Sequence, residues 1–481
     1  MYQVFGVKYH IMRTSNGLHI IRNAKHLIPN INRQAVNGQT GYIMLMALVM
    51  GLVLSMLGLI GTQILINNMR FTKFEERQSR ALDVAEAGIN YYLWHLAHNP
   101  SDYQDGTSLP AAAPFGPYTH NYYDNDGNLI GAYTLTVTPP TNGSTVTTVK
   151  SLGTVPNMGG GRTILAQLGQ PSFSNYIFLS NTELVFSATS TTTGPVHSNV
   201  GVDFNGTNNG PVTAARTTYT SGVDGASHTG VWGTGGPKSQ WQYPVPAVDF
   251  NKVTVNLSDM QTQSQPSNGG VNLGTSGGAG WYLQLKSGSP ASFDVYKVSS
   301  ESTTGITKTF IRTQAVPTDG IVFSPETVWI AGTGFTGRMT VVAAYLPDTA
   351  SKRRSINVIG DLTYAASDGT AAIGLVAQQD VFIPRYVPST MTVNAAVLAQ
   401  YGSVGYDTAN GGLKTAFTLY GAIAQNQNAY GFKTTGCSPY CTGFPTTSYN
   451  FDSHLIYAPP PSFPTTGNYS VLNWREQLFS P

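Results

Sequence analysis

The chain has 481 residues, room for two or three domains, and only 10% of them are charged, against about 25% in an average soluble domain. Its 52 glycines and 26 tyrosines are typical of a β-rich extracellular surface and argue against a cytosolic helical enzyme. Residues 1–41 carry five basic and no acidic residues, which leaves a weakly acidic body of 21 basic and 24 acidic residues without a basic cluster, so no nucleic-acid partner is predicted.

The first predicted element is a membrane-spanning helix at residues 42–66, which contain no charged residue. These 25 residues would extend for roughly 37 Å as a helix, enough to cross a hydrocarbon core of about 30 Å. The run is too long for a secretory signal peptide and lacks a small-residue cleavage site. Because basic residues flank the cytoplasmic side, we predict a single-pass protein with residues 1–41 as a cytoplasmic leader and the body outside the lipid bilayer.

The helix is expected to continue beyond the membrane through residues 67–98, which lack proline and contain one glycine, Gly88. Apolar residues recur there at three- and four-residue spacing and mark one face that would pack on a globular domain. This face consists of Leu82, Ala85, Ile89, Tyr92, Leu93 and Leu96. Pro100 would end the helix, at a length of roughly 85 Å.

Two segments of this helix resemble the N-terminal region of minor-pilin-like proteins of type IV pilus assembly. They are S-x-L-G, from Ser55 to Gly58, and R-A-x-x-x-A-E-A-G, from Arg80 to Gly88. In pilins, a prepilin peptidase cuts after the glycine that precedes the apolar run. The resemblance therefore implies cleavage between Gly41 and Tyr42, with the bond after Gly38 as second choice, and implies prepilin peptidase and other pilin-like subunits as partners.

The resemblance is incomplete. Major pilins carry a glutamate at the fifth mature position, where this chain has Met46, which favours a minor, tip or non-polymerised role. The leader is also long, and initiation at Met12 would shorten it. A signal-anchored membrane protein outside any filament is the alternative interpretation.

The A-E-A-G residues have specific expected roles. Gly88, with Ala85 and Ala87, would make a thin helix face that admits a sheet or a neighbouring helix. Glu86 is either an intersubunit contact or a solvated helix position, and Arg80 opens the motif.

A small antiparallel sheet is predicted after the helix. Residues 115–168 contain three runs of alternating apolar and polar residues, separated by Pro-Pro, Asn-Gly and Gly-Gly-Gly turns. A helix packed on such a sheet is the head architecture of pilins, so residues 67–168 are expected to form one domain, closed by a linker at 169–175.

Residues 169–481 are predicted to form a β-helix or similar β-solenoid. The tripeptide GPV occurs at 194–196 and 210–212, and an apolar residue followed by Ala-Gln occurs at 376–378, 398–400 and 423–425. Short strands that recur with Gly, Asn and Asp at corners are what stacked coils require, although a β-sandwich or an irregular sheet would also fit. We expect an insertion near 241–350 and a Pro-rich C-terminal tail that caps the last coil. This region resembles uncharacterised C-terminal domains of pilus-assembly proteins.

The two cysteines, Cys437 and Cys441, can close a small disulfide loop in an exported domain. Free thiols are the second possibility. A zinc site is the third, because two thiols with only His454 nearby fall short of four ligands.

No sequence motif indicates catalysis, and no cofactor or metal is predicted. Ionisable residues of the repeat region are scattered, one per coil and mostly at turn positions, where aspartates are expected to cap the backbone. These are His197, Asp203, Asp361, Asp380, Arg385 and Asp407. The sequence therefore predicts an α+β protein, not an enzyme, that assembles or decorates a type IV pilus-like filament and serves surface adhesion through a glycan or protein ligand. A surface-binding protein outside a filament and a carbohydrate-active β-helix enzyme are the alternatives.

Overall fold

A computed structural model describes residues 40–100, 102–140, 146–157, 159–428, 431–434, 442–467 and 469–477. Residues 1–39 of the predicted leader and the cysteine pair Cys437 and Cys441 lie outside the described residues. The chain divides into two compact units, residues 1–73 and 74–481. The long helix α1 (Thr40–His98) contributes to both.

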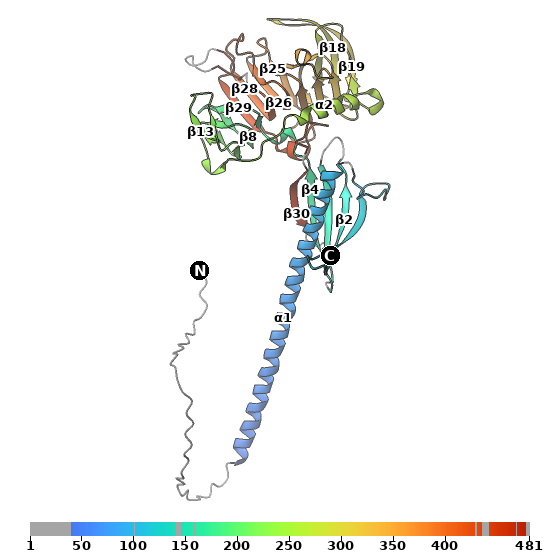
Figure 1. The fold of residues 1–481 in the computed structure, drawn as a ribbon, viewed down its shortest axis with the longest axis vertical. Coiled ribbons are helices and arrows are strands. Elements are labelled where there is room, and N and C mark those ends of the chain that lie inside the picture. Colours follow the sequence, from blue (N-terminus) through green and yellow to red (C-terminus); the bar gives the residue numbers. More distant parts are fainter. Residues whose placement is uncertain are drawn as a thin grey trace. The chain divides into compact units, whose positions relative to one another are not determined.

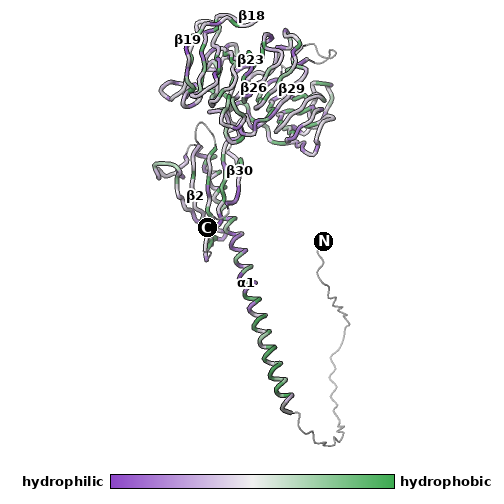
Figure 2. The backbone as a smooth tube through the Cα atoms, turned by 180° about the vertical axis from the view of Figure 1, so that it is seen from behind, coloured by the Kyte–Doolittle hydropathy of each residue, from purple (hydrophilic) through white to green (hydrophobic). Residues whose placement is uncertain are grey.

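The first unit contains the apolar half of α1. Every large apolar side chain between Tyr42 and Ile66 is exposed, and Figure 2 shows this half of the helix as a continuous apolar stretch. The helix is long and apolar enough to cross a membrane. A helix that is apolar on all sides and makes no protein core is stable in lipid, where its backbone hydrogen bonds are satisfied internally.

The second unit begins with the head, which consists of the C-terminal part of α1 and a five-stranded antiparallel sheet in the order β1-β2-β3-β4-β30. Its strands are β1 (Phe115–Tyr123), β2 (Leu129–Thr138), β3 (Val146–Thr154), β4 (Arg162–Gly169) and β30 (Ser470–Gln477). The strands β2 to β4 alternate buried and half-exposed residues, as expected when one sheet face packs on a helix. The fold class predicted from the sequence, a long helix followed by a small sheet and a large β-rich domain, is confirmed.

The last strand of the head comes from the C-terminus of the chain. β30 pairs antiparallel with β4, from Ser470 opposite Gly169 to Gln477 opposite Thr163. The whole β-rich domain is thus inserted between the fourth and fifth strands of the head sheet (Figure 1). The expected capping tail is therefore divided. Residues 458–461 lie against the β-helix, where Arg338 donates to the carbonyls of Ala458 and Pro459, and the chain then returns to the head.

The inserted domain is a parallel β-helix built from three stacks of short strands. The first stack runs in the order β15-β11-β8-β5-β28-β26-β24-β22-β20-β16. Its strands are β5 (Phe178–Ser180), β8 (Val196–Ser198), β11 (Val212–Ala214), β15 (Trp241–Gln242), β16 (Val271–Asn272), β20 (Ile321–Ser324), β22 (Arg338–Ala343), β24 (Ala372–Ala377), β26 (Thr390–Ala399) and β28 (Ala416–Gln425).

The second and third stacks complete the coils. The second has two parts, β14-β9-β6 and β27-β25-β23-β21-β17. Its strands are β6 (Leu184–Phe186), β9 (Val202–Phe204), β14 (Val231–Trp232), β17 (Gly280–Lys286), β21 (Thr327–Phe335), β23 (Ile356–Tyr364), β25 (Val381–Ile383) and β27 (Val404–Tyr406). The third contains β29 (Thr446–Phe451), β7 (Thr191–Thr192) and β10 (Thr207–Asn208).

The chain builds this β-helix in two runs that meet in its middle. The first run, residues 178–242, winds away from β5, and the second run, residues 271–451, starts at the far end and winds back to β28. β28 then pairs with β5, where Ile423 lies opposite Phe178. We call this junction the seam. On the second stack the described strands β6 and β27 do not pair, and a cavity of about 370 Å³ lies between the runs there.

Three elements project from the stacks. The helix α2 (Lys252–Gln263) connects the two runs and packs Val253, Leu257 and Met260 on the outer side of the first stack. The hairpin β18 (Ser292–Ser302) and β19 (Gly305–Ala315) extends from β17, and the hairpin β12 (Thr218–Thr220) and β13 (Ser227–Thr229) lies in the first run. Short 3₁₀ turns complete the structure at Phe173–Asn175, Lys238–Gln240, Pro266–Asn268, Ala350–Lys352 and Ser453–Ile456.

The insertion expected near residues 241–350 is smaller in the structure. Residues 271–272, 280–286 and 321–343 include strands of the stacks, so only α2 and the β18–β19 hairpin project in this range. The strands of these coils carry no repeated tripeptide, and the sequence therefore gave no sign that they continue the stacking.

Candidate functional site

The A-E-A-G segment forms part of the contact between α1 and the head sheet. Ala81 and Ala85 are fully buried, and a Cβ added at Gly153 of β3 would collide with the carbonyl of Ala81 and the backbone of Ala85. A Cβ at Gly88 would likewise collide with the Ser151 hydroxyl on the same strand. The small residues therefore let helix and sheet backbones approach closely, which is the thin face expected from the sequence.

The other residues of the segment face away from the sheet. Glu86 is exposed, and Ala87 is half-buried. Arg80 is exposed and pairs with Glu76 one turn earlier, at 2.8 Å between Nη2 and Oε1, a helix-surface pair worth a few tenths of a kcal/mol. At the proposed cleavage position, Gly41 lies within α1, and the Tyr42 side chain is exposed.

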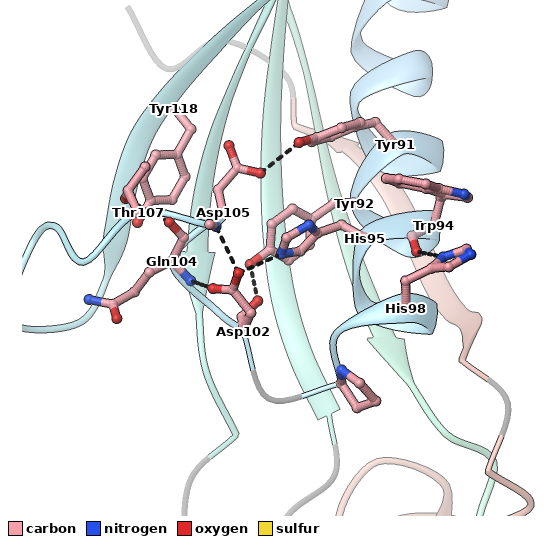
Figure 3. Close-up of polar contacts among 12 residues, drawn as sticks. Tyr91, Tyr92, Trp94, His95, His98, Asp102, Gln104, Asp105, Thr107 and Tyr118 are labelled. Carbon is pink, nitrogen blue, oxygen red and sulfur yellow. Dashed lines mark hydrogen bonds and ion pairs between the residues drawn. The ribbon is translucent and has the colours of Figure 1, made fainter.

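A polar cluster holds the C-terminal end of α1 (Figure 3). His95 is buried, and its Nε2 lies 3.2 Å from Oδ2 of Asp102. The same carboxylate accepts the backbone N–H groups of Gln104 and Gly106, at 2.9 and 2.7 Å. The two hydrogen bonds fix the loop that follows the helix and stabilise a half-exposed carboxylate.

A second carboxylate in the loop, Asp105, joins the helix to the sheet. It accepts the Tyr91 hydroxyl at 2.9 Å, and its other oxygen lies 2.7 Å from Nε2 of His120 on β1. Burial, and then the hydrogen bond to Asp105, raise the pKa of Tyr91 above its ordinary value. Apart from His95 Nε2, which lies near Asp102 without a hydrogen bond, the polar groups named here bond to their neighbours and hold helix, loop and sheet together.

A groove on the β-helix is the second candidate site. The β18–β19 hairpin overhangs the outer side of the second stack, and two adjoining cavities of about 390 and 350 Å³ lie beneath it. Both are lined by Glu301 of the hairpin and Phe382 of β25. We call them together the hairpin groove.

The floor of the groove is organised by strand register. Trp329, Asn357 and Phe382 lie opposite one another on β21, β23 and β25. Their sequence neighbours Val328, Ile330, Ile356, Val358, Val381 and Ile383 point into the core of the β-helix. Because side chains alternate along a strand, these three form a column on the outer side, with about 4.8 Å between successive strands.

Glu301 ties the hairpin to this floor. Its Oε1 accepts the Tyr386 hydroxyl at 2.6 Å and the Trp329 indole N–H at 3.2 Å. Burial, and then the hydrogen bond to Glu301, raise the pKa of Tyr386 above its ordinary value. The wall of the groove is therefore fixed by two hydrogen bonds to one carboxylate.

Two further carboxylates and one guanidinium line the groove. Asp380 accepts the backbone N–H of Ser403 at 2.9 Å, and burial raises the pKa of its carboxyl. Asp407 caps the following turn by accepting the N–H of Asn410 at 3.1 Å, and Nε of Arg385 lies 3.2 Å from its Oδ2. Asp407 thus caps a turn, as expected, whereas Asp380 bonds to Ser403 of the next coil, and the fold brings both aspartates into one groove.

The sequence did not indicate the groove. Asp380, Arg385 and Asp407 had been singled out, but Glu301 and Trp329 had not, because they reach the site through the projecting hairpin and the strand register. His197, Asp203 and Asp361 lie outside the two cavities. One sequence pattern could have indicated the floor of the groove. It is a single polar or aromatic residue between two β-branched residues, as in Ile356-Asn357-Val358 and Val381-Phe382-Ile383. In the described part of the chain no group of three or more His, Cys, Asp or Glu side chains could hold a metal ion.

Comparisons with known proteins give little further information. No family model and no curated protein matches the chain. Among solved structures, the chain matches the competence-associated pilin ComZ from Thermus thermophilus at 13% identity and a TM-score of 0.28, over 84% of this chain and 98% of that one. Similarity at this level does not define a function, so the proposals below depend on the residues of this chain.

Proposed function

We propose that this chain is a membrane-anchored, minor-pilin-like structural subunit that assembles or decorates a type IV pilus-like filament and presents its β-helix for surface adhesion. The observation that carries the proposal is the division of α1. Its residues 42–66 are apolar and exposed, whereas Ala81, Ala85 and Gly88 pack directly on an antiparallel sheet. A helix of this kind can hold the chain in a bilayer, or against the helices of other subunits, while the head stays folded outside.

Met46 supports a minor position over a shaft position. A buried glutamate near the mature N-terminus would pair with the terminal amine of a neighbour, and a methionine cannot. The β-helix inserted between β4 and β30 adds about 300 residues to the head, counted from Gly169 to Ser470. A domain of this size fits a subunit that occurs once, at the end of a filament, better than a subunit that is repeated along the filament shaft.

The experiment is mass spectrometry of the N-terminal peptide of the protein purified from its own membranes. We expect a mature chain that starts at Tyr42. The variant Gly41→Leu should retain its leader, whereas the matched variant Gly38→Leu should be processed normally. An intact leader in the parent chain would overturn the proposal and favour the signal-anchored alternative. Co-purification with filament subunits provides the second readout.

We also propose that the hairpin groove binds and does not catalyse. Each of its three carboxylates is engaged by its own neighbours, Glu301 by Tyr386 and Trp329, Asp380 by Ser403, and Asp407 by Arg385. Glycoside hydrolysis needs one carboxyl as acid and a second as nucleophile or base across the bond. Incubation with laminarin, dextran and polygalacturonate should release no new reducing ends. Release of reducing ends that is lost in Asp380→Asn would make the chain an enzyme.

A further inference from the structure

The hairpin groove contains a polar side chain that indicates a ligand-binding site. Asn357 is only 8% exposed and lines the larger cavity. No hydrogen bond joins its side-chain amide to another described residue, and the amide atoms are not sealed from the cavity. An amide that reaches a cavity without a partner in the protein can bond to water or to the hydroxyl of a ligand that enters the cavity.

The surroundings of Asn357 combine apolar ring surface with hydroxyl and carboxylate groups. Phe382 is half-buried and lies beside it in the column, shared by both cavities. Thr327, Ser355 and Asp380 border the larger cavity. Ring faces that meet C–H groups, next to acceptors and donors for hydroxyls, are the combination that suits a sugar ring.

The charge of the groove restricts the class of sugar. Its lining includes Glu301, Asp380 and Asp407 but a single cation, Arg385, which is paired with Asp407. A polyanion such as a uronic-acid polymer or a nucleic acid would meet uncompensated like charge. Neutral hydroxyls, in contrast, donate well to carboxylates.

We propose that the hairpin groove is a binding site for a neutral polysaccharide, which lies along the second stack with Asn357 bonding a hydroxyl and Phe382 stacking on a ring. The strands repeat every ~4.8 Å along this direction, so an extended chain can meet successive strands. This proposal names a ligand class for the adhesive role. It rests on the proposed pilin-like function only for its biological setting.

The test is affinity electrophoresis of the full chain in detergent, in native gels that contain laminarin, dextran, mannan or galactan, with alginate and polygalacturonate as anionic probes. We expect retardation by at least one neutral glycan and by neither polyanion. Asn357→Ala and Phe382→Ala should each weaken binding about tenfold, the loss of one hydrogen bond or stacking contact. The control Phe310→Ala removes an exposed aromatic of β19 that is outside the groove lining and should bind as the parent does.

The outcomes are distinguishable from those of the N-terminal experiment. Thermal unfolding of each variant shows whether it is folded, and Phe382→Ala, at a partly exposed position, keeps the test valid if Asn357→Ala is unstable. Retardation by no neutral glycan, stronger retardation by a polyanion, or unchanged binding by folded variants would overturn the glycan proposal. A chain processed at Tyr42 that binds no glycan would retain the pilin-like proposal and lose only this one.

Discussion

The head and the β-helix are both closed by segments that lie far apart in the sequence, but different forces hold them. In the head, a helix lies on one face of a sheet, and small residues at Ala85, Gly88 and Gly153 set the distance between them. In the β-helix, no helix is needed to form the core, because each coil buries its apolar residues against the next. The head therefore depends on a few close contacts, and the β-helix on many similar ones.

The largest effect is expected from removing the strand that closes the head. Truncation after Gly467 deletes β30 and its seven residue pairs with β4. At roughly 0.2–1 kcal/mol per cross-strand pair, the head should lose a few kcal/mol of stability. Hydrogen exchange measured by mass spectrometry should show lost protection in β4 and retained protection in β22 to β26. A chain that ends at Gln477 is the control, and unchanged exchange in β4 would contradict the role of β30.

The seam should be the sensitive point of the β-helix. Leu375, Val397, Ile423, Phe178 and Val196 form one interior column that crosses from the second run to the first. Ile423→Ala should cost about 3 kcal/mol and expose the amides of β5 and β8 to exchange. The matched variant Leu375→Ala removes a similar volume away from the seam. Equal exchange in the first run for both variants would show that the seam is not a weak point.

The close approach of helix and sheet predicts a smaller effect in the head. Gly153→Val places a side chain against the backbone of Ala81 and Ala85 and should destabilise the head by about 2 kcal/mol. Gly159→Ala is the control, because a Cβ there meets nothing within 4 Å. Thermal unfolding followed by limited proteolysis of α1 would measure the difference. Equal behaviour of the two variants would contradict direct packing of the A-E-A-G face.

The smallest effect concerns pH and the groove. Burial raises the pKa of Asp380 in the folded state, so the ionised carboxyl destabilises the fold at neutral pH, and this cost disappears as the pH falls through the folded pKa. Asp380→Asn keeps an acceptor for the Ser403 N–H. It should raise the unfolding midpoint at neutral pH, with a gain that vanishes below about pH 4. Asp259→Asn, on an exposed position of α2, is the control. An increase in the unfolding midpoint that becomes larger at low pH would contradict this prediction.

Part of the β-helix register was visible in the sequence and part was not. The GPV tripeptides do stack, with Val196 opposite Val212. Val376 also lies opposite Leu398, as their shared Ala-Gln motif predicts. The third copy is shifted by one residue, however, so that Leu398 faces Ala424. Because the coils differ in length, stacking keeps apolar residues on the inner face but does not keep the motif aligned. Strand pairing therefore decides the register.

The sequence by itself determined the elements that local composition controls. The uncharged run of residues 42–66 requires lipid or a helical partner, and the small residues Ala85 and Gly88 require a close neighbour. Alternating apolar residues and turn residues likewise made the remainder β-rich.

Only the tertiary structure decided which distant segments meet. It placed β30 beside β4, joined the two runs at β5 and β28, and brought Glu301 over Asn357 and Phe382. These contacts depend on where chain segments end in space, and backbone hydrogen bonding between strands carries no side-chain signature that would reveal the partner in advance.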